Sequence, residues 1–339
     1  MNNQSLFLES IKLFITEYLP TAKGASPNTI RSYKYTFKLL FKFMEQFGKS
    51  PDKIAFSDFS VEIFEKFFQW ILNERKCSLS TKNQRHAALL SFSEYAQNHN
   101  FDAALSFRTN LLKIPLKKAQ KKLRSYFTPE EVHILLALPN LDTYFGFRNQ
   151  VIMSLMYASG ARAQEICDLK VKDFNTDFNN KSTLSLTGKG NKTRKVFISG
   201  KSASLLSEYI RKNKLEGKLD KYIFSSLTHE HCTISCIEEI FRKYISEARE
   251  KYPNLFLGTN YSPHSMRHST ASHMLEAGVP LIVIKNFLGH ASLASTQVYA
   301  ELSQGAVDDA VKQWNKQWFS SELEKEIPKN NEILDFLED

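Results

Sequence analysis

The stretch SPHSMRHSTASHMLEAG, residues 262–278, is one of five segments whose order along this 339-residue chain decides the fold. Pro263 directly before His264 predicts that a helix begins here. His264 and Arg267 are three residues apart, so they face the same way on that helix. Arginine is a bidentate clamp for phosphate, whereas histidine moves a proton near neutral pH. The segment therefore predicts a helix that presents a group for phosphate binding and a group for proton transfer.

His264 and His268 also have the four-residue spacing of a helical metal-binding pair. The segment lacks the glutamate that follows the first histidine in a zinc protease motif. We therefore discount a metal at this helix.

Upstream, the stretch YASGARAQEICDL, residues 157–169, places Arg162 at a glycine break just before a predicted helix over 163–169. Glu165 follows three residues later, where its carboxylate can support the arginine from the same helical face. Taken alone, this pair is an ordinary salt bridge.

Between these two segments the sequence pattern changes from helical spacing to alternating apolar and polar residues. Residues 182–186 and 195–198 alternate as strands do, and Gly188 and Gly190 flank Lys189 in the turn between them. The predicted second domain is thus mostly helical with a small antiparallel sheet near its start. A lysine at such a tip is exposed and can reach a DNA groove, although its ordinary interpretation is a polar turn.

Downstream, an amphipathic helical pattern ends at Leu288 and Gly289, and His290 follows at once. Tyr299 comes nine residues later, in the stretch STQVYA. A single tyrosine is most often a half-buried core residue. Its significance depends on the basic and imidazole groups that precede it.

Taken together, these segments resemble the tyrosine recombinase (phage integrase) family. The matching stretches are YASGARAQEICDL, TGKGNKTRKVFI, SPHSMRHSTASHMLEAG and IKNFLGHASLASTQVYAEL, and in the N-terminal part TIRSYKYTFKLLFKF and STKNQRHAALLSF. Six positions carry the family's expected residue types in the expected order: Arg162, Lys189, His264, Arg267, His290 and Tyr299. The sequence departs from the family at Ala300 and Glu301, where a Thr-His pair is common.

The resemblance implies an enzyme that cleaves and rejoins duplex DNA through a 3′-phosphotyrosyl intermediate, with Tyr299 as the nucleophile. Arg162 and Arg267 are then expected to clamp the phosphate, and Lys189 to protonate the leaving 5′-oxygen. His264 is expected to assist deprotonation of the tyrosine, and His290 to donate a hydrogen bond to the phosphate. Glu165 and His268 are supporting residues. The mechanism needs neither a cofactor nor a metal.

Residues 1–112 read as a compact bundle of four or five helices, similar to the family's helical core-binding (SAM-like) domain. Residues 113–124, KIPLKKAQKKLR, carry basic residues and no acidic one, which indicates a linker. The catalytic domain is expected over 125–320 and a tail over 321–339. The candidates for DNA contact are Lys82, Asn83, Arg85, His86, Lys117, Lys118, Lys121 and Lys122.

The formal net charge of +9 fits a phosphate-bearing partner. We expect double-stranded DNA at a recombination site, bound by a homotetramer with one dimer per site. Apolar stripes lie at residues 307–318 and 333–337. The family resemblance implies a C-terminal helix that docks on the neighbouring subunit, and we assign the stripe at 333–337 to it, with packing on its own domain as the alternative. An accessory activator protein is a further candidate partner.

No stretch is long and apolar enough for a membrane span, and the N-terminus lacks the build of a signal peptide, so we expect a cytoplasmic protein. Four cysteines are too sparse for a disulfide framework. Cys232 and Cys236 lie close to His229 and His231 in the sequence, so a zinc site is a candidate. The expected second pair of ligands is missing, and a polar turn before a helix explains the segment better.

Two biological roles are compatible with the resemblance: Xer-like resolution of chromosome or plasmid dimers, and integration or excision of a mobile element. The short N-terminal region favours the simpler Xer-like build. A different class is a catalytically silent DNA-binding protein of the same fold, and a third is a metal-dependent nuclease.

Overall fold

The computed structural model describes residues 3–116, 125–179, 181–188, 190, 192–198, 200–226 and 229–289. The chain divides into two compact units, residues 1–122 and 123–339. Each unit has its own hydrophobic core. Within the described ranges, no helix has the length and apolar character needed to cross a membrane.

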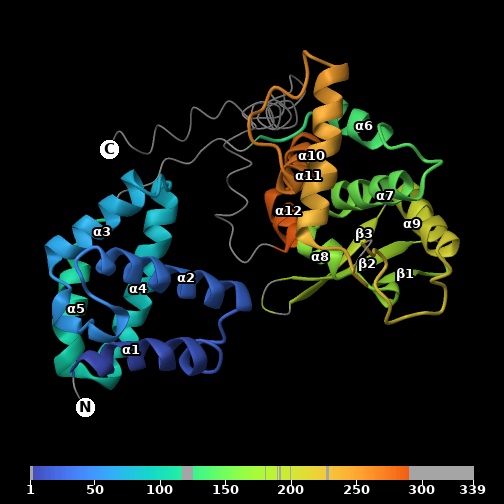
Figure 1. Ribbon diagram of the computed structural model, residues 1–339. Helices are drawn as coiled ribbons and strands as arrows, with labels where there is room; N and C mark the ends of the chain where they lie inside the picture. Colours follow the sequence, from blue (N-terminus) through green and yellow to red (C-terminus); the bar gives the residue numbers. More distant parts are fainter. Residues whose placement is uncertain are drawn as a thin grey trace, which may run out of the picture. The chain divides into compact units, whose positions relative to one another are not determined.

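The N-terminal unit is a helical bundle, as the sequence predicts (Figure 1). A π-helical turn over Phe14–Tyr18 extends its first helix. The helices are α1 (Asn3–Leu13), α2 (Pro27–Glu45), α3 (Val61–Asn73), α4 (Leu79–His99) and α5 (Phe101–Leu112).

Serine caps begin three of these helices. The side chains of Ser26, Ser60 and Ser78 each accept a hydrogen bond from the backbone N–H three residues on. That bond satisfies one of the donors that a helix N-terminus leaves unpaired. The fourth helix therefore begins at Leu79, directly after its cap Ser78.

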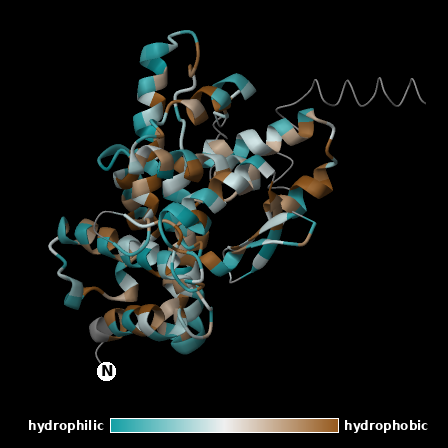
Figure 2. Cartoon of the chain, turned by 90° about the vertical axis from the view of Figure 1, so that its right-hand side faces the viewer, coloured by the Kyte–Doolittle hydropathy of each residue, from teal (hydrophilic) through white to brown (hydrophobic). Residues whose placement is uncertain are grey.

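Phenylalanine rings fill the bundle core, and Phe92 of α4 lies at their centre, fully buried. Ring centroids at 5.1–6.1 Å surround it. They belong to Phe7, Phe14, Phe37, Phe56 and Phe107. In Figure 2 brown and teal residues share individual helices, consistent with apolar faces that pack inward.

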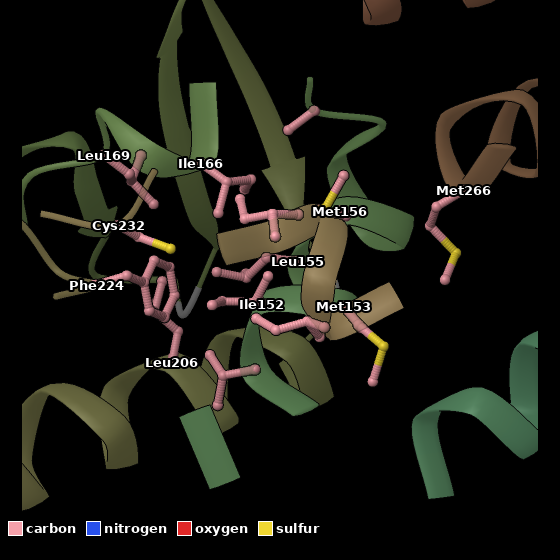
Figure 3. Packing of buried hydrophobic residues seen from close by; sticks show 14 of the residues in the cluster. Ile152, Met153, Leu155, Met156, Ile166, Leu169, Leu206, Phe224, Cys232 and Met266 are labelled. Carbon is pink, nitrogen blue, oxygen red and sulfur yellow. The ribbon is translucent and has the colours of Figure 1, made fainter. Parts of the chain in front are cut away.

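The C-terminal unit is built around α7 (Tyr144–Ser159), which is buried along most of its length. Helices α9 and α11 and strand β3 pack against it. In Figure 3 the side chains of Ile152, Leu155 and Met156 lie among those from other elements, such as Ile166 and Leu206. A helix that is buried on most sides lies inside a domain, and this one supplies much of the core of the C-terminal unit.

Around α7 lie the other elements of this unit. They are α6 (Pro129–Ala137), α8 (Ala163–Cys167), β1 (Phe174–Thr176), β2 (Ser182–Thr187), β3 (Thr193–Ile198), α9 (Gly200–Lys212), α10 (Ile234–Lys251), α11 (Pro263–Glu276) and α12 (Leu281–Leu288).

The predicted hairpin and the mainly α class are confirmed. Strands β2 and β3 pair antiparallel and close with Thr187 opposite Thr193. The short strand β1, which the sequence did not indicate, adds the third strand in the order β1-β2-β3. The helix predicted over 163–169 ends at Cys167.

We predict that Phe92→Ala destabilises the N-terminal bundle by about 3–5 kcal/mol, because the cavity left between the surrounding rings cannot collapse. Urea denaturation measures the loss. Phe101→Ala is the matched control, because that ring is 60% exposed, and it should change stability by about 0.5 kcal/mol or less. Equal effects of the two substitutions would contradict this description of the core.

Candidate active site

Arg162 lies at the junction of α7 and α8. Gly160 ends α7 with a left-handed backbone (φ 57°, ψ 26°), which lets the chain turn sharply before the arginine. Arg162 is then the N-cap of α8, and its backbone N–H donates to Glu165 Oε2 at 2.9 Å. The helix start is thus built from the two residues that the sequence paired.

The Glu165 carboxylate lies between two guanidinium groups. Arg162 Nη1 donates to Oε1 at 2.7 Å, while Arg194 of β3 donates to Oε1 at 2.9 Å and to Oε2 at 2.8 Å. The Glu165 side chain is only 1% exposed, against 34% for Arg162 and 13% for Arg194. Burial alone raises the pKa of Glu165, but hydrogen bonds from Arg194 and from the Arg162 backbone lower it to about 2.

Arg267 of α11 is almost completely buried, at 1% exposure. Its Nη1 donates to the carbonyl of Gly160 and its Nη2 to the carbonyl of Leu288, both at 2.6 Å. One side chain therefore connects α11 to the turn before Arg162 and to the last turn of α12. Helix C-termini leave carbonyls unpaired and carry partial negative charge, so a cation is stabilising there.

His264 lies in the first turn of α11 and is exposed, whereas His268 is buried, with 5% of its surface exposed. Their rings are 4.9 Å apart and nearly perpendicular, at 86°. The sequence predicted that His264 and Arg267 share a helical face, but the structure gives them opposite exposures.

The segment before α11 is anchored to α6. The buried carboxylate of Glu131 accepts hydrogen bonds from the backbone of Phe256 and from the Tyr261 hydroxyl. The Tyr261 ring stacks on Phe127 at 4.5 Å, with the planes 9° apart. These contacts position the chain that leads to His264.

Lys189, His290 and Tyr299 lie outside the described residues, and their predicted roles stay predictions. The glycines directly before the first two are described. A Cβ added to Gly188 would lie 2.9 Å from Glu165 Oε1, and one added to Gly289 would lie 2.9 Å from Arg194 Cδ. Both backbones therefore approach the Arg162–Glu165–Arg194 cluster so closely that a larger residue would force its side chains to shift.

Arg194 is the residue that the sequence interpretation missed, although it lies within TGKGNKTRKVFI. Alternation along β3 places it on the same face as Val196 and Ile198, which are buried. A charged residue on the buried face of a strand needs a partner, and this pattern was a usable signal.

The DNA-contact candidates of the N-terminal unit divide by burial. Lys82 and His86 are 5% and 2% exposed, and Lys82 donates to the carbonyl of Pro115, just after α5. Asn83 and Arg85 are half-buried. Lys82 and His86 do not face solvent and leave the candidate set, and the four lysines at 117, 118, 121 and 122 lie outside the described residues.

Residues 229–236, which contain the cysteines and histidines of the candidate zinc site, form a turn and the beginning of α10, with Thr233 as its N-cap. Cys232 is fully buried. Hydrogen bonding to Cys232 and burial raise the pKa of Cys167. Among the described residues, no group of three or more His, Cys, Asp or Glu side chains is arranged to hold a metal ion.

Both units of the chain match families of known proteins. Residues 125–305 match the phage integrase family, and residues 13–103 match the phage integrase N-terminal SAM-like domain. The tyrosine recombinase XerC of Halalkalibacterium halodurans is 30% identical over 86% of this chain and 92% of its own length. XerD of Chlamydia trachomatis is 29% identical over 89% and 95%.

The fold also resembles that of the XerH site-specific recombinase in a post-cleavage complex. The TM-score is 0.66 at 21% identity, over 93% of this chain and 90% of that one. The chain belongs to the phage integrase family. It is a site-specific tyrosine recombinase, an enzyme that breaks and rejoins DNA strands.

We predict that Gly160→Ala costs roughly 3 kcal/mol in unfolding free energy, from left-handed strain of about 1 kcal/mol and overpacking of about 2 kcal/mol. The added Cβ would lie 2.6 Å from Cδ2 of the buried Leu288. Gly278→Ala isolates the strain, because Gly278 has φ +80° and open space around it. Urea denaturation of both variants measures the difference, and equal losses would contradict the close packing of α12 on this turn.

Proposed function

We propose that this recombinase cleaves DNA with Tyr299, within a site assembled from Arg162, Lys189, His264, Arg267 and His290. The observation that carries the proposal is that one arginine, Arg267, joins two separate segments that each lead to a predicted site residue. Arg267 donates to Gly160, two residues before Arg162, and to Leu288, two residues before His290. Arg267 thus links the backbone that leads to Arg162 with the backbone that leads to His290.

In the proposed reaction, the Tyr299 hydroxyl oxygen attacks the scissile phosphorus and the bond to the 5′-oxygen breaks. A 3′-phosphotyrosyl bond and a free 5′-hydroxyl result. Arg162 stabilises the charge on the non-bridging oxygens. The same role for Arg267 stays a prediction, because both of its Nη atoms donate to backbone carbonyls in the structure. A 5′-hydroxyl from another strand then reverses the step, and the covalent bond conserves the energy for rejoining.

The remaining groups handle protons and orientation. A tyrosine with an ordinary pKa of about 10 is a weak nucleophile at neutral pH, so His264 takes the phenolic proton. Lys189 gives a proton to the departing 5′-oxygen, and His290 donates a hydrogen bond to the phosphate. Glu165 orients Arg162, and His268 packs against His264 at the start of α11.

For the whole chain, we propose a core-binding domain over 1–112, a DNA-tracking linker over 113–124, a catalytic domain over 125–320 and a tail over 321–339. The partner is a duplex recombination site, to which two protomers bind, and two such sites form a tetramer. The XerH structure that shares the fold is bound to its palindromic difH substrate. Arg85, Asn83 and the linker lysines are the candidate contacts, and an activator protein is a further candidate partner.

The Xer-like role in dimer resolution and the mobile-element role both use this chemistry. The XerC and XerD relatives favour the first, and a relative named as a putative integrase/recombinase in Sinorhizobium fredii, 29% identical, keeps the second open. Sequencing the DNA that stays attached to the protein separates them, because the attached site belongs either to a replicon or to the end of an inserted element.

We predict that incubation with a nicked suicide substrate traps a covalent protein–DNA adduct, because the cleaved strand diffuses away and cannot be rejoined. Tyr299→Phe should abolish the adduct, since it removes the attacking oxygen. Tyr252→Phe is the matched control, as that ring is 42% exposed on the surface of the same unit. Denaturing gel electrophoresis detects the adduct.

EDTA should leave adduct formation unchanged. A metal-dependent nuclease predicts cleavage that is lost in EDTA and survives Tyr299→Phe. Binding without any adduct indicates the catalytically silent protein. Either result overturns the proposed function.

A further inference from the structure

Arg194 has an unusual position for a charged residue. It lies on β3, on the face that also carries the buried Val196 and Ile198, and its side chain is 13% exposed. A buried guanidinium is costly unless its donors are satisfied. Its partners therefore explain why the fold retains it.

The Arg194 guanidinium bridges two elements besides its own strand. Two nitrogens form a fork onto both oxygens of Glu165 in α8, at 2.9 and 2.8 Å. Nε donates to the carbonyl of Phe287 at 3.0 Å, in the last turn of α12. Only a planar fork with donors on two edges satisfies this set, and lysine cannot replace it.

The charges of the cluster do not cancel. Arg162 and Arg194 contribute two positive charges and Glu165 contributes one negative charge, so the cluster carries one net positive charge. Without Arg194, the buried Glu165 carboxylate would pair with Arg162 alone and neutralise it. Arg162 is the more exposed of the two arginines, at 34% against 13%.

The cluster also packs against the backbone at two glycines, Gly289 and Gly188. Gly289 packs against Arg194 so closely that a Cβ would lie 3.3 Å from Nη1, and Gly188 faces Glu165 Oε1 and Arg162 Nη1. The two glycines immediately precede His290 and Lys189. Figure 1 shows α8, the end of α12 and the hairpin β2–β3 in the same part of the C-terminal unit.

We infer that Arg194 is a positioning residue of the strand-cleavage reaction. By sharing Glu165 it leaves the cluster with a net positive charge toward the scissile phosphate, and by binding the Phe287 carbonyl it holds the end of α12 against the hairpin. The inference rests on the proposed function, because it assigns Arg162 to the phosphate. Arg194 itself touches neither the phosphate nor the nucleophile in this account.

The test is single-turnover cleavage of the nicked substrate by full-length variants. Arg194→Gln should slow cleavage about 50-fold and Arg194→Lys about fivefold, both below the 100-fold or larger loss expected on removing a direct donor to the reacting phosphate. Lys195→Gln is the matched control, because it removes the same charge from the next, exposed residue of β3. Its rate should stay within about twofold of the wild type.

A rescue variant separates charge balance from simple structural support. Arg194→Gln combined with Glu165→Gln removes the negative charge that would neutralise Arg162, and it should cleave faster than Arg194→Gln alone. A merely structural role predicts that the double variant is as slow as the single variant or slower, because both native partners are then lost. That outcome overturns the inference.

Thermal melts accompany each rate. If Arg194→Gln does not fold, Arg194→Lys alone tests the inference. A fivefold slower cleavage at an unchanged melting temperature supports it, and a wild-type cleavage rate overturns it. Wild-type protein without an adduct overturns the proposed function and the inference together. Wild-type cleavage that Tyr299→Phe abolishes, with full activity in Arg194→Gln, overturns the inference alone.

Discussion

The Glu165 carboxylate is the group on which the described part of the site depends. It is almost wholly withdrawn from water and accepts hydrogen bonds from Arg162 Nη1, the Arg162 backbone and both Nη atoms of Arg194. A buried carboxylate is tolerated only when it is paired and hydrogen-bonded in this way, and removing one partner leaves an uncompensated charge. The same requirement draws α8, the β2–β3 hairpin and the arginine of the N-cap together.

A second constraint follows from the end of α12. Adjacent carbonyls there, of Phe287 and Leu288, accept from Arg194 and Arg267 respectively. The two arginines come from a strand and a helix that are distant in sequence, and they stabilise the partial negative charge at the helix end. Gly160 and Gly289 permit this approach, because side chains at either position would collide with Leu288 or with Arg194. Packing and electrostatics thus specify one arrangement of these segments.

Much of the fold could be predicted from local signals. Pro263 indicated the start of α11, because its fixed φ suits the first helical position and its missing N–H is not needed there. Alternation identified the β2–β3 hairpin. The strand β1 was missed because three residues are too few to show alternation.

The site was less predictable where a polar residue lies inside. Lys82 and His86 are residue types that often contact DNA, yet their helical spacing places them on the stripe of the buried Leu89 and Ala96. Arg194 is the same case on a strand. Composition assigns such residues to the surface, whereas periodicity assigns them to the interior, and here periodicity was the better guide. The partner of Arg194 could not be predicted, because Glu165 lies 29 residues away in sequence.

The central claim is that Glu165 stays ionised between two arginines, and its own titration tests that most directly. The pKa of Glu165 is lowered from 4.5 to about 2. The pair therefore contributes stability at neutral pH, and this contribution is lost as pH falls from about 4.5 towards 2. A carbon-13 NMR titration of glutamate-labelled protein, with Glu165→Gln to assign the signal, follows this carboxyl group alone. The account predicts that the carboxyl remains ionised below pH 3 for as long as the protein is folded, and an ordinary midpoint near 4.5 would contradict it.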